Sequence, residues 1–225
     1  MKYNYVLFDA DETLFSFNAF AGLQKMLAAY GMDFTKADYE HYQNTNKPLW
    51  IAYQNNEITA NHLQVTRFSE LANKLNVPAQ QLNDDFLSAM AEICMPLPGA
   101  VELLNALKPH AKLGIITNGF SQLQARRLAH TGLQDMFDWL VISEKVGIAK
   151  PAKEIFEHTF NLMGNPPKEQ ILMVGDTASS DILGGRNAGI DTCWLQHPGV
   201  ILPEGIKPTY QVTELKQLQI GRAHV

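Results

Sequence analysis

The sequence predicts an α/β fold, in which a doubly wound parallel sheet carries an inserted all-helical segment. Five mostly apolar runs of four residues recur along the chain, and helical patterns alternate with them from residue 112 onward. Apolar runs without alternating polar residues are typical of parallel strands covered on both faces. Residues 17–95 show only helical spacing. The alternation therefore predicts the sheet, and the helical stretch predicts an insertion after the first strand.

The predicted strands are rich in Val, Ile, Leu and aromatic residues. They cover residues 5–8, 113–116, 139–142, 171–174 and 192–195. In the α/β part, helices are expected over residues 121–131, 153–163 and 181–188, each closed by a glycine. Glycine is a common helix C-terminal signal, because it adopts the left-handed conformation without steric cost. The order of strand and helix predicts βα units and therefore parallel strands.

The insert contains three helical patterns. One helix is expected near residues 20–30, a second over residues 63–75 with Thr59 as its N-cap, and a third over residues 79–93. These patterns predict an all-helical domain with no strand of its own.

Domain boundaries follow from the positions of the strands and of the insert. We expect an α/β core over residues 1–16 and 96–219 and a helical cap over residues 17–95. The last six residues, 220–225, match a translation of a widely used sequencing-adapter oligonucleotide, so we expect them to be a non-native tail.

Composition excludes several classes of partner. The chain has 225 residues, 46% of them hydrophobic, and a net charge of -5, so no broad basic field favours nucleic acid polymers or anionic membranes. No apolar run approaches the ~20 residues that a membrane span needs. Two cysteines without a C-x-x-C spacing indicate reduced thiols. We expect a cytoplasmic protein, a monomer or weak oligomer, that acts on a small molecule.

Pairs of acidic residues follow two of the predicted strands. Asp9 and Asp11, in the pattern D-x-D-x-T, come directly after the first strand. Asp176 and Asp181, in the pattern G-D-x-x-x-x-D, follow the fourth strand. Each pattern alone also fits a polar turn or a helix N-cap. Because ligands of open α/β sheets bind at the carboxyl ends of the strands, the four carboxylates are expected to lie together there.

Two more polar segments follow the second and third strands. Thr117, Asn118 and Gly119 offer a hydroxyl and backbone N–H groups at the start of a helix, which suits a phosphate, although Asn-Gly is also a hairpin signal. Lys150, which precedes Pro151, is by itself typical of a solvated surface lysine. The joint pattern, with every segment at one edge of one sheet, favours a single site over four unrelated turns.

The order of these four motifs resembles the haloacid dehalogenase-like hydrolase superfamily, and the insert resembles the cap of its first subclass. Segments of both insert and core, including NKPLW, AEIC and LMVGDTASSDILGG, resemble the bacterial pyrimidine 5′-nucleotidases of that superfamily. The resemblance implies a phosphomonoesterase that hydrolyses nucleoside 5′-monophosphates, pyrimidine and deoxy forms in particular, under a cap that closes over the site.

Clustered carboxylates would repel a phosphate, so the site requires a cation. Carboxylates are hard oxygen ligands that suit Mg²⁺, and we expect Mn²⁺ to substitute for it. Asp9 and Asp176 are the expected side-chain ligands, and the resemblance implies that Asp11 adds its backbone carbonyl. Asp181 is expected either to bind the metal through water or to hold the Lys150 ammonium.

The expected chemistry is in-line attack on phosphorus. Asp9 would form an aspartyl-phosphate, and Asp11 would protonate the leaving oxygen and later activate water. The phosphoryl oxygens would be held by Thr117, Lys150 and the backbone N–H groups near Asn118 and Gly119. In the insert, candidates for reading a nucleoside are Asn46, Lys47 and Trp50, although Trp50 also fits a core position.

Three other functions remain open. A sugar-phosphate or phosphoglycolate-type phosphatase would share every motif, because the motifs read only the phosphate. A haloacid dehalogenase would need neither Mg²⁺ nor an acid two residues after the nucleophile, so Asp11 and Asp176 argue against it. A catalytically inactive binding protein would not need the intact carboxylates and Lys150.

Overall fold

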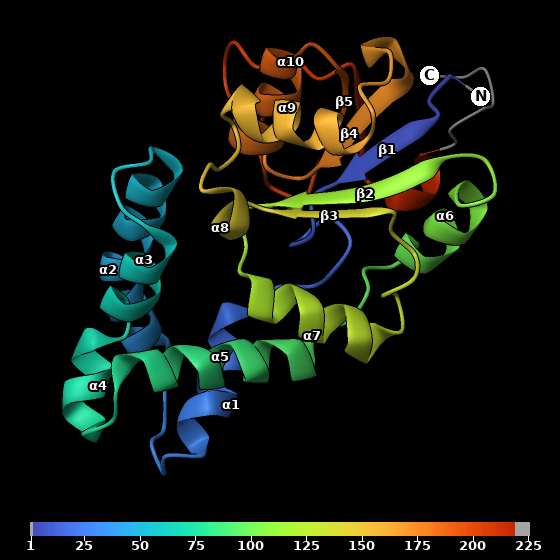
Figure 1. Ribbon diagram of the computed structural model, residues 1–225. Helices are drawn as coiled ribbons and strands as arrows, with labels where there is room; N and C mark the ends of the chain where they lie inside the picture. Colours follow the sequence, from blue (N-terminus) through green and yellow to red (C-terminus); the bar gives the residue numbers. More distant parts are fainter. Residues whose placement is uncertain (1, 219–225) are drawn as a thin grey trace. The chain divides into compact units, whose positions relative to one another are not determined.

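A six-stranded sheet organises residues 2–218, the part of the chain that this computed structural model describes (Figure 1). All strand pairs are parallel, in the order β3-β2-β1-β4-β5-β6. The strands are β1 (Tyr5–Phe8), β2 (Lys112–Thr117), β3 (Trp139–Ile142), β4 (Ile171–Gly175), β5 (Asp191–Leu195) and β6 (Tyr210–Val212). The chain moves outward from β1 to β3 in one direction and from β4 to β6 in the other, which confirms the predicted doubly wound sheet.

Strand β1 lies at the point where the winding direction changes. Its register places Phe8 opposite Ile115 of β2 and Val174 of β4. Because all three strands run the same way, the residues that follow them leave the sheet at one edge. This edge is where an open α/β sheet binds its ligand.

Helices cover both faces of the sheet, with α9 and α10 on one face and α6 on the other (Figure 1). Their bounds are α6 (Ala100–Leu107), α8 (Ser143–Val146), α9 (Lys153–Leu162) and α10 (Leu183–Ala188). On the α9 face, Phe156 and Phe160 pack with Leu7, Ile116 and Met173 in one buried cluster. Each such side chain contributes about 1.5–3 kcal/mol by leaving water. Burial on two sides explains why the central strands read as uninterrupted apolar runs.

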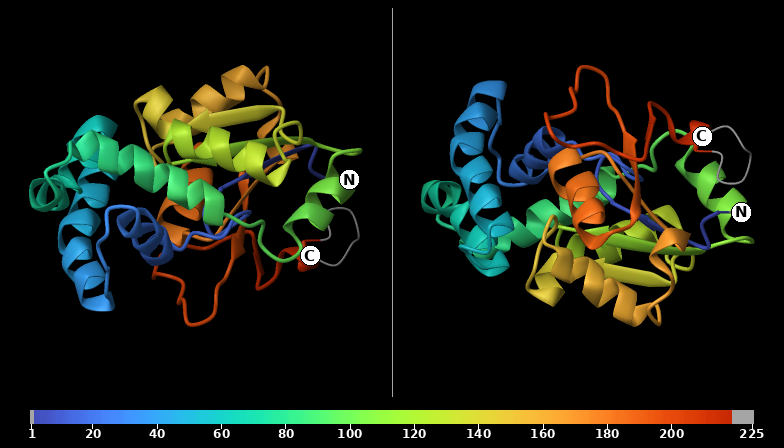
Figure 2. Two further views of the ribbon diagram at one scale, coloured as in Figure 1. Left: turned by 90° about the horizontal axis from the view of Figure 1, so that it is seen from below. Right: turned by 90° about the horizontal axis from the view of Figure 1, so that it is seen from above.

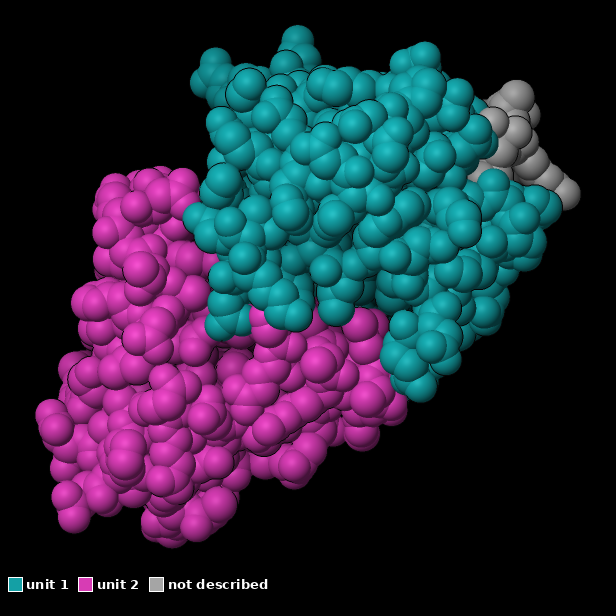
Figure 3. All heavy atoms as spheres, in the orientation of Figure 1, with its two compact units in different colours: residues 1–16, 95–119, 131–225 teal, residues 17–94, 120–130 magenta. Residues whose placement is uncertain are grey.

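The chain divides into two compact units (Figure 3). Unit 1 comprises residues 1–16, 95–119 and 131–225, and unit 2 comprises residues 17–94 and 120–130. The helices of unit 2 are α1 (Ala19–Ala28), α2 (Lys36–Gln54), α3 (Ala60–Thr66), α4 (Ser69–Leu75), α5 (Ala79–Ile93) and α7 (Ser121–Thr131). Residues 220–225, expected to be non-native, lie outside the described residues.

Helix α7 belongs to unit 2, whereas its position in the sequence had suggested the α/β core. Arg126 of α7 donates a hydrogen bond to Ser88 of α5. The ring of Phe120, just before α7, lies 5.3 Å from the ring of Trp50 on α2. Such contacts join segments far apart in the chain, so sequence order could not assign this helix.

The helices of the insert differ from the expected three. The segment over residues 63–75 is two helices, because the chain turns at Arg67 and Phe68, whose side chains are both buried. Thr59 caps the first of them as predicted, by accepting a hydrogen bond from His62 N–H at 3.2 Å. Helix α2 was missed because it is largely polar, with only Tyr42 and Tyr53 buried.

Three short elements of the core were also missed. Strand β6 is an edge strand without a fully buried residue, helix α6 carried no motif, and α8 stands where a loop was expected. The helix expected over residues 181–188 begins earlier, with a π-turn over Ala178–Ile182. Among the described residues, no helix is long and apolar enough to cross a membrane. Cys94 and Cys193 are buried free thiols.

Candidate active site

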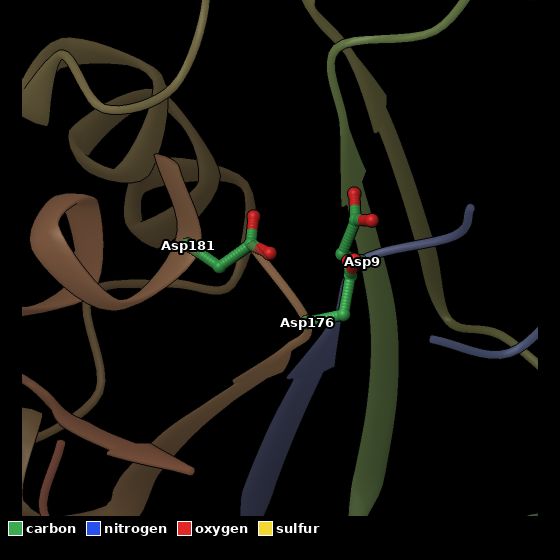
Figure 4. Close-up of side chains that lie close together, drawn as sticks. All are labelled: Asp9, Asp176 and Asp181. Carbon is green, nitrogen blue, oxygen red and sulfur yellow. The ribbon is translucent and has the colours of Figure 1, made fainter. Parts of the chain in front are cut away.

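Three carboxylates meet at the carboxyl edge of the central strands. Asp9 follows β1, Asp176 follows β4, and Asp181 lies in the turn after β4. One oxygen from each of the three lies within 4.8 Å of the others, and the side chains lie close together (Figure 4). The Asp9 backbone N–H donates to Val174 O at 2.9 Å, which continues the sheet pairing up to the site. The sheet itself therefore brings together residues that are far apart in the sequence.

Lys150 is buried among these carboxylates, with only 1% of its surface exposed. Its Nζ lies 2.6 Å from Asp9 Oδ1 and 2.8 Å from Asp181 Oδ1, and it donates to Ile116 O at 2.7 Å. An ammonium has three protons to donate, and these contacts use all three. Lys150 is therefore not a surface lysine but the cation of the site.

Asn118 positions Lys150 through the backbone. Its Oδ1 accepts from Lys150 N–H at 2.8 Å, and its Nδ2 donates to Lys150 O at 2.9 Å. The backbone N–H groups near Asn118 were the ones expected to hold the phosphate. The side-chain amide of Asn118 has a different role, because both of its polar atoms bond to the Lys150 backbone. Gly119 N–H donates to Thr117 Oγ1 at 3.0 Å, so this N–H is also engaged. The bond leaves the Thr117 hydroxyl proton to donate elsewhere.

The loop of Asp176 is held by two residues to which the sequence had assigned no role. Thr13, which is fully buried, accepts from Asp176 N–H at 3.0 Å, and its hydroxyl lies 3.3 Å from Asp176 Oδ1. Trp194 Nε1 donates to Asp176 O at 2.6 Å. Thr13 is the last residue of D-x-D-x-T, so the spacing carried a signal for it. Trp194 resembled any buried strand residue.

Asp181 supports Lys150 with one oxygen and its own loop with the other. Its Oδ1 contacts Lys150 and accepts from Ser180 Oγ at 3.1 Å, while Oδ2 accepts from Thr177 N–H at 3.0 Å. A side chain on Gly175 would place its Cβ only 2.3 Å from Asp181 Oδ2. The glycine of G-D-x-x-x-x-D is thus required by the last aspartate of the same motif.

Burial and mutual repulsion dominate the electrostatics. Burial raises the pKa of Asp9 well above its ordinary value, the carboxylates of Asp181, Asp11 and Asp176 raise it further, and Lys150 acts in the opposite direction. Burial alone would lower the pKa of Lys150, but Asp181 and Asp9 together outweigh it and raise that pKa. Burial, helped by Asp181, raises the pKa of Asp176 to about 6. The carboxylates exceed what Lys150 neutralises, and this surplus of hard oxygen donors fits a divalent cation.

The three insert residues predicted to read a nucleoside lie together on α2, in unit 2. Trp50 is half-buried, and its ring packs 5.3 Å from Phe120 and 5.9 Å from Tyr53. Asn46 donates to Gln43 Oε1 at 2.9 Å, and Lys47 is exposed. All of the phosphate-site candidates belong to unit 1.

Comparisons with known proteins cover almost the whole chain. A sequence model of the family described as haloacid dehalogenase-like hydrolase matches residues 3–189. The chain is 57% identical, over 219 residues, to a pyrimidine 5′-nucleotidase of Escherichia coli strain K12, with 97% of each chain covered. It is 33% identical to a pyrimidine 5′-nucleotidase of Streptococcus pneumoniae, with 97% of this chain and 94% of the relative covered.

A solved structure shows the same fold. The crystal structure of a hydrolase of this type from Bacillus subtilis, bound to magnesium, superposes with a TM-score of 0.83 at 30% sequence identity. The superposition covers 97% of each chain. The likeness therefore includes the helical insert as well as the sheet.

Proposed function

This chain belongs to the haloacid dehalogenase-like hydrolase family, and we propose that it is a Mg²⁺-dependent phosphomonoesterase that hydrolyses nucleoside 5′-monophosphates, pyrimidine and deoxy forms in particular. The observation that carries the substrate assignment is the 57% identity with a pyrimidine 5′-nucleotidase across both core and insert. The chemistry is supported separately by the buried contact of Lys150 with Asp9 and Asp181.

Asp9 is the nucleophile of this proposal. One of its oxygens attacks phosphorus, the bond from phosphorus to the ester oxygen breaks, and an aspartyl-phosphate forms. Asp11 gives its proton to the leaving oxygen and then takes a proton from the water that hydrolyses the intermediate. Lys150 and the Thr117 hydroxyl stabilise the negative charge on the transferring group. Phosphoryl transfer depends mainly on such positioning and charge stabilisation.

The residues that would hold Mg²⁺ are Asp9 and Asp176, with the Asp11 carbonyl as the third group. Bound Mg²⁺ would neutralise charge on the phosphoryl oxygens. Asp181 serves the site by holding Lys150, because its oxygens already accept from Lys150, Ser180 and Thr177. Residues 17–95 are proposed as the cap, and Asn46, Lys47 and Trp50 as its candidates for reading the base.

A substrate panel tests the assignment. Phosphate release from pyrimidine and purine 5′-nucleotides, ribo and deoxy, is compared with release from sugar phosphates and phosphoglycolate. We expect a pyrimidine 5′-nucleotide to have the highest kcat/KM. A sugar phosphate that exceeds every nucleotide by about 10-fold, equivalent to ~1.4 kcal/mol of transition-state binding, would favour the alternative phosphatase.

The surplus of carboxylates over the single Lys150 ammonium predicts that the stabilisation of the folded protein by Mg²⁺ depends on pH. The pKa of Asp176 is about 6 in the folded metal-free protein, above the ~3.9 of an unfolded aspartate. Ionisation therefore costs folding stability as the pH rises through this range, and a bound cation removes the cost. We expect Mg²⁺ to raise Tm more at pH 8 than at pH 5, in thermal melts with NaCl at equal ionic strength as the control. An equal rise at both pH values, or none at pH 8, would contradict the proposed metal site.

A further inference from the structure

Two side chains at or just after the end of β5 contact the two loops that carry the aspartates, namely the loop of Asp9 and Asp11 and the loop of Asp176 and Asp181 (the carboxylate loops). Strand β5 itself contributes to none of the four motifs. Trp194 donates to the carbonyl of Asp176, as described above. His197, in the long loop that follows β5 (Figure 2), places its Nε2 2.6 Å from the carbonyl oxygen of Glu12. A carbonyl oxygen can only accept, so the Nε2 of His197 must carry the proton and donate it.

Glu12 is the residue directly after Asp11, and its backbone is unusual. Its φ of 54° lies in the left-handed region, which few residues other than glycine adopt. Hydrogen bonds within the turn run from Glu12 N–H to Phe15 O at 2.7 Å and from Leu14 N–H to Ala10 O at 3.0 Å. His197 adds a bond from outside the turn, to the carbonyl of the left-handed residue itself. The peptide next to Asp11 is thus held by a side chain from the loop that follows β5.

We propose that His197 is a positioning residue for Asp11. The inference rests on the proposed function, in which Asp11 moves a proton to and from the reacting oxygens. A general acid must lie within hydrogen-bond reach of its target, and a displacement of about 1 Å can cost ~10²-fold in rate. By holding the Glu12 carbonyl, His197 keeps the backbone beside Asp11 in its left-handed conformation and thereby fixes the position of Asp11. The Asp11 carbonyl proposed for Mg²⁺ belongs to the same stretch of backbone, so the variants are compared at saturating Mg²⁺, where a loss confined to the nucleotide reports the proton-transfer role.

If His197 positions Asp11, the loss of activity in His197→Ala should depend on the leaving group of the ester. A general structural role would lower the activity with every ester equally. An alkyl ester such as a nucleoside 5′-monophosphate leaves as a basic alkoxide and needs the proton of Asp11, whereas nitrophenyl phosphate leaves as a stable anion. We expect His197→Ala to lower kcat for the nucleotide by ~10-fold or more, with KM changed by less than ~3-fold. The rate at which nitrophenyl phosphate phosphorylates the enzyme, followed by rapid mixing, should stay within ~3-fold of wild type.

Two further variants control the experiment. Gln presents an N–H donor at a similar reach, so His197→Gln should restore most of the nucleotide turnover. Gln196, one residue earlier, donates to Val200 O at 2.8 Å and accepts from Gln211 at 2.8 Å, and it has no described contact with either carboxylate loop. Gln196→Ala should therefore behave as wild type with both substrates. Equal losses with both substrates for His197→Ala, no loss with either, or no recovery in His197→Gln would overturn the proposal.

A spectroscopic measurement tests the bond without activity. In ¹⁵N-labelled Mg²⁺-loaded protein, long-range ¹H–¹⁵N correlations should show His197 protonated at Nε2. A neutral ring protonated at Nδ1 instead would overturn the proposal. Wild-type protein that hydrolyses neither ester would refute the proposed function, while the ring spectrum would still decide whether His197 holds Glu12.

Discussion

Replacing Asp9 by Asn is expected to abolish turnover of every phosphate ester, whatever its leaving group. The amide keeps the shape of the side chain but lacks the charged oxygen that attacks phosphorus. Removal of a nucleophile typically costs ~10⁴-fold or more in kcat. Burial above all, and then the neighbouring carboxylates, raise the pKa of Asp9, so its charge does not stabilise the metal-free fold and loss of that charge should leave the fold intact. Steady-state kinetics and circular dichroism measure the two expectations.

An exposed aspartate of the same unit provides the control for Asp9. Asp135 is exposed and makes none of the contacts described for the site, so Asp135→Asn should retain wild-type kinetics. Nucleotide turnover by Asp9→Asn within ~10-fold of wild type would assign the attacking group to another residue.

Replacing Lys150 by Ala is the second change with a large expected effect. It removes the charge that stabilises the transferring group, and loss of one such group costs ~10²–10³-fold in kcat. It also leaves Asp9 and Asp181 buried without the ammonium that contacts both. Breaking a buried ion pair costs about 3–5 kcal/mol, so the metal-free variant should unfold at a clearly lower denaturant concentration.

Lys153 is the matched control for Lys150. It lies on α9, its side chain is 55% exposed, and its Nζ is 3.3 Å from Glu157. Lys153→Ala should change the free energy of unfolding by less than about 0.5 kcal/mol and leave kcat unchanged. Similar kcat and similar free energies of unfolding in the two alanine variants would show that Lys150 has no special role in the site.

Much of the core was predictable because its signals are local. Strands buried on both faces must be apolar throughout, so runs such as Ile171 to Val174 were recognisable from composition. A carboxylate directly after such a strand marks the ligand-binding edge of the sheet. Asp9 and Asp176 could therefore be assigned to one edge from the sequence alone.

Residues whose role depends on a distant partner were not predictable in the same way. The backbone N–H groups near Asn118 were expected to serve the phosphate, and nothing in the sequence indicated that its side-chain amide holds the backbone of a residue 32 positions away. His197 lies 185 positions from the carbonyl that it contacts. Trp194 is a buried strand residue, and its sequence context indicates nothing more. Only the fold shows that its indole N–H donates to the carbonyl of Asp176.

In the proposed mechanism, Asp9 carries the phosphoryl group during turnover. The Asp11→Asn protein is suited to test it, because nitrophenyl phosphate does not need the proton of Asp11 to leave, and the aspartyl-phosphate then lacks the base that activates water. The protein is mixed rapidly with nitrophenyl phosphate and Mg²⁺, the nitrophenolate burst is recorded, and the quenched protein is digested for mass spectrometry.

The expected result is a burst of at most one nitrophenolate per active site, followed by slow turnover, with the mass of one phosphoryl group added to the peptide that contains Asp9. The Asp9→Asn protein should give neither burst nor added mass. Phosphoryl transfer to a different residue, or identical behaviour of the two variants while both bind Mg²⁺, would contradict the assignment of Asp9 as nucleophile.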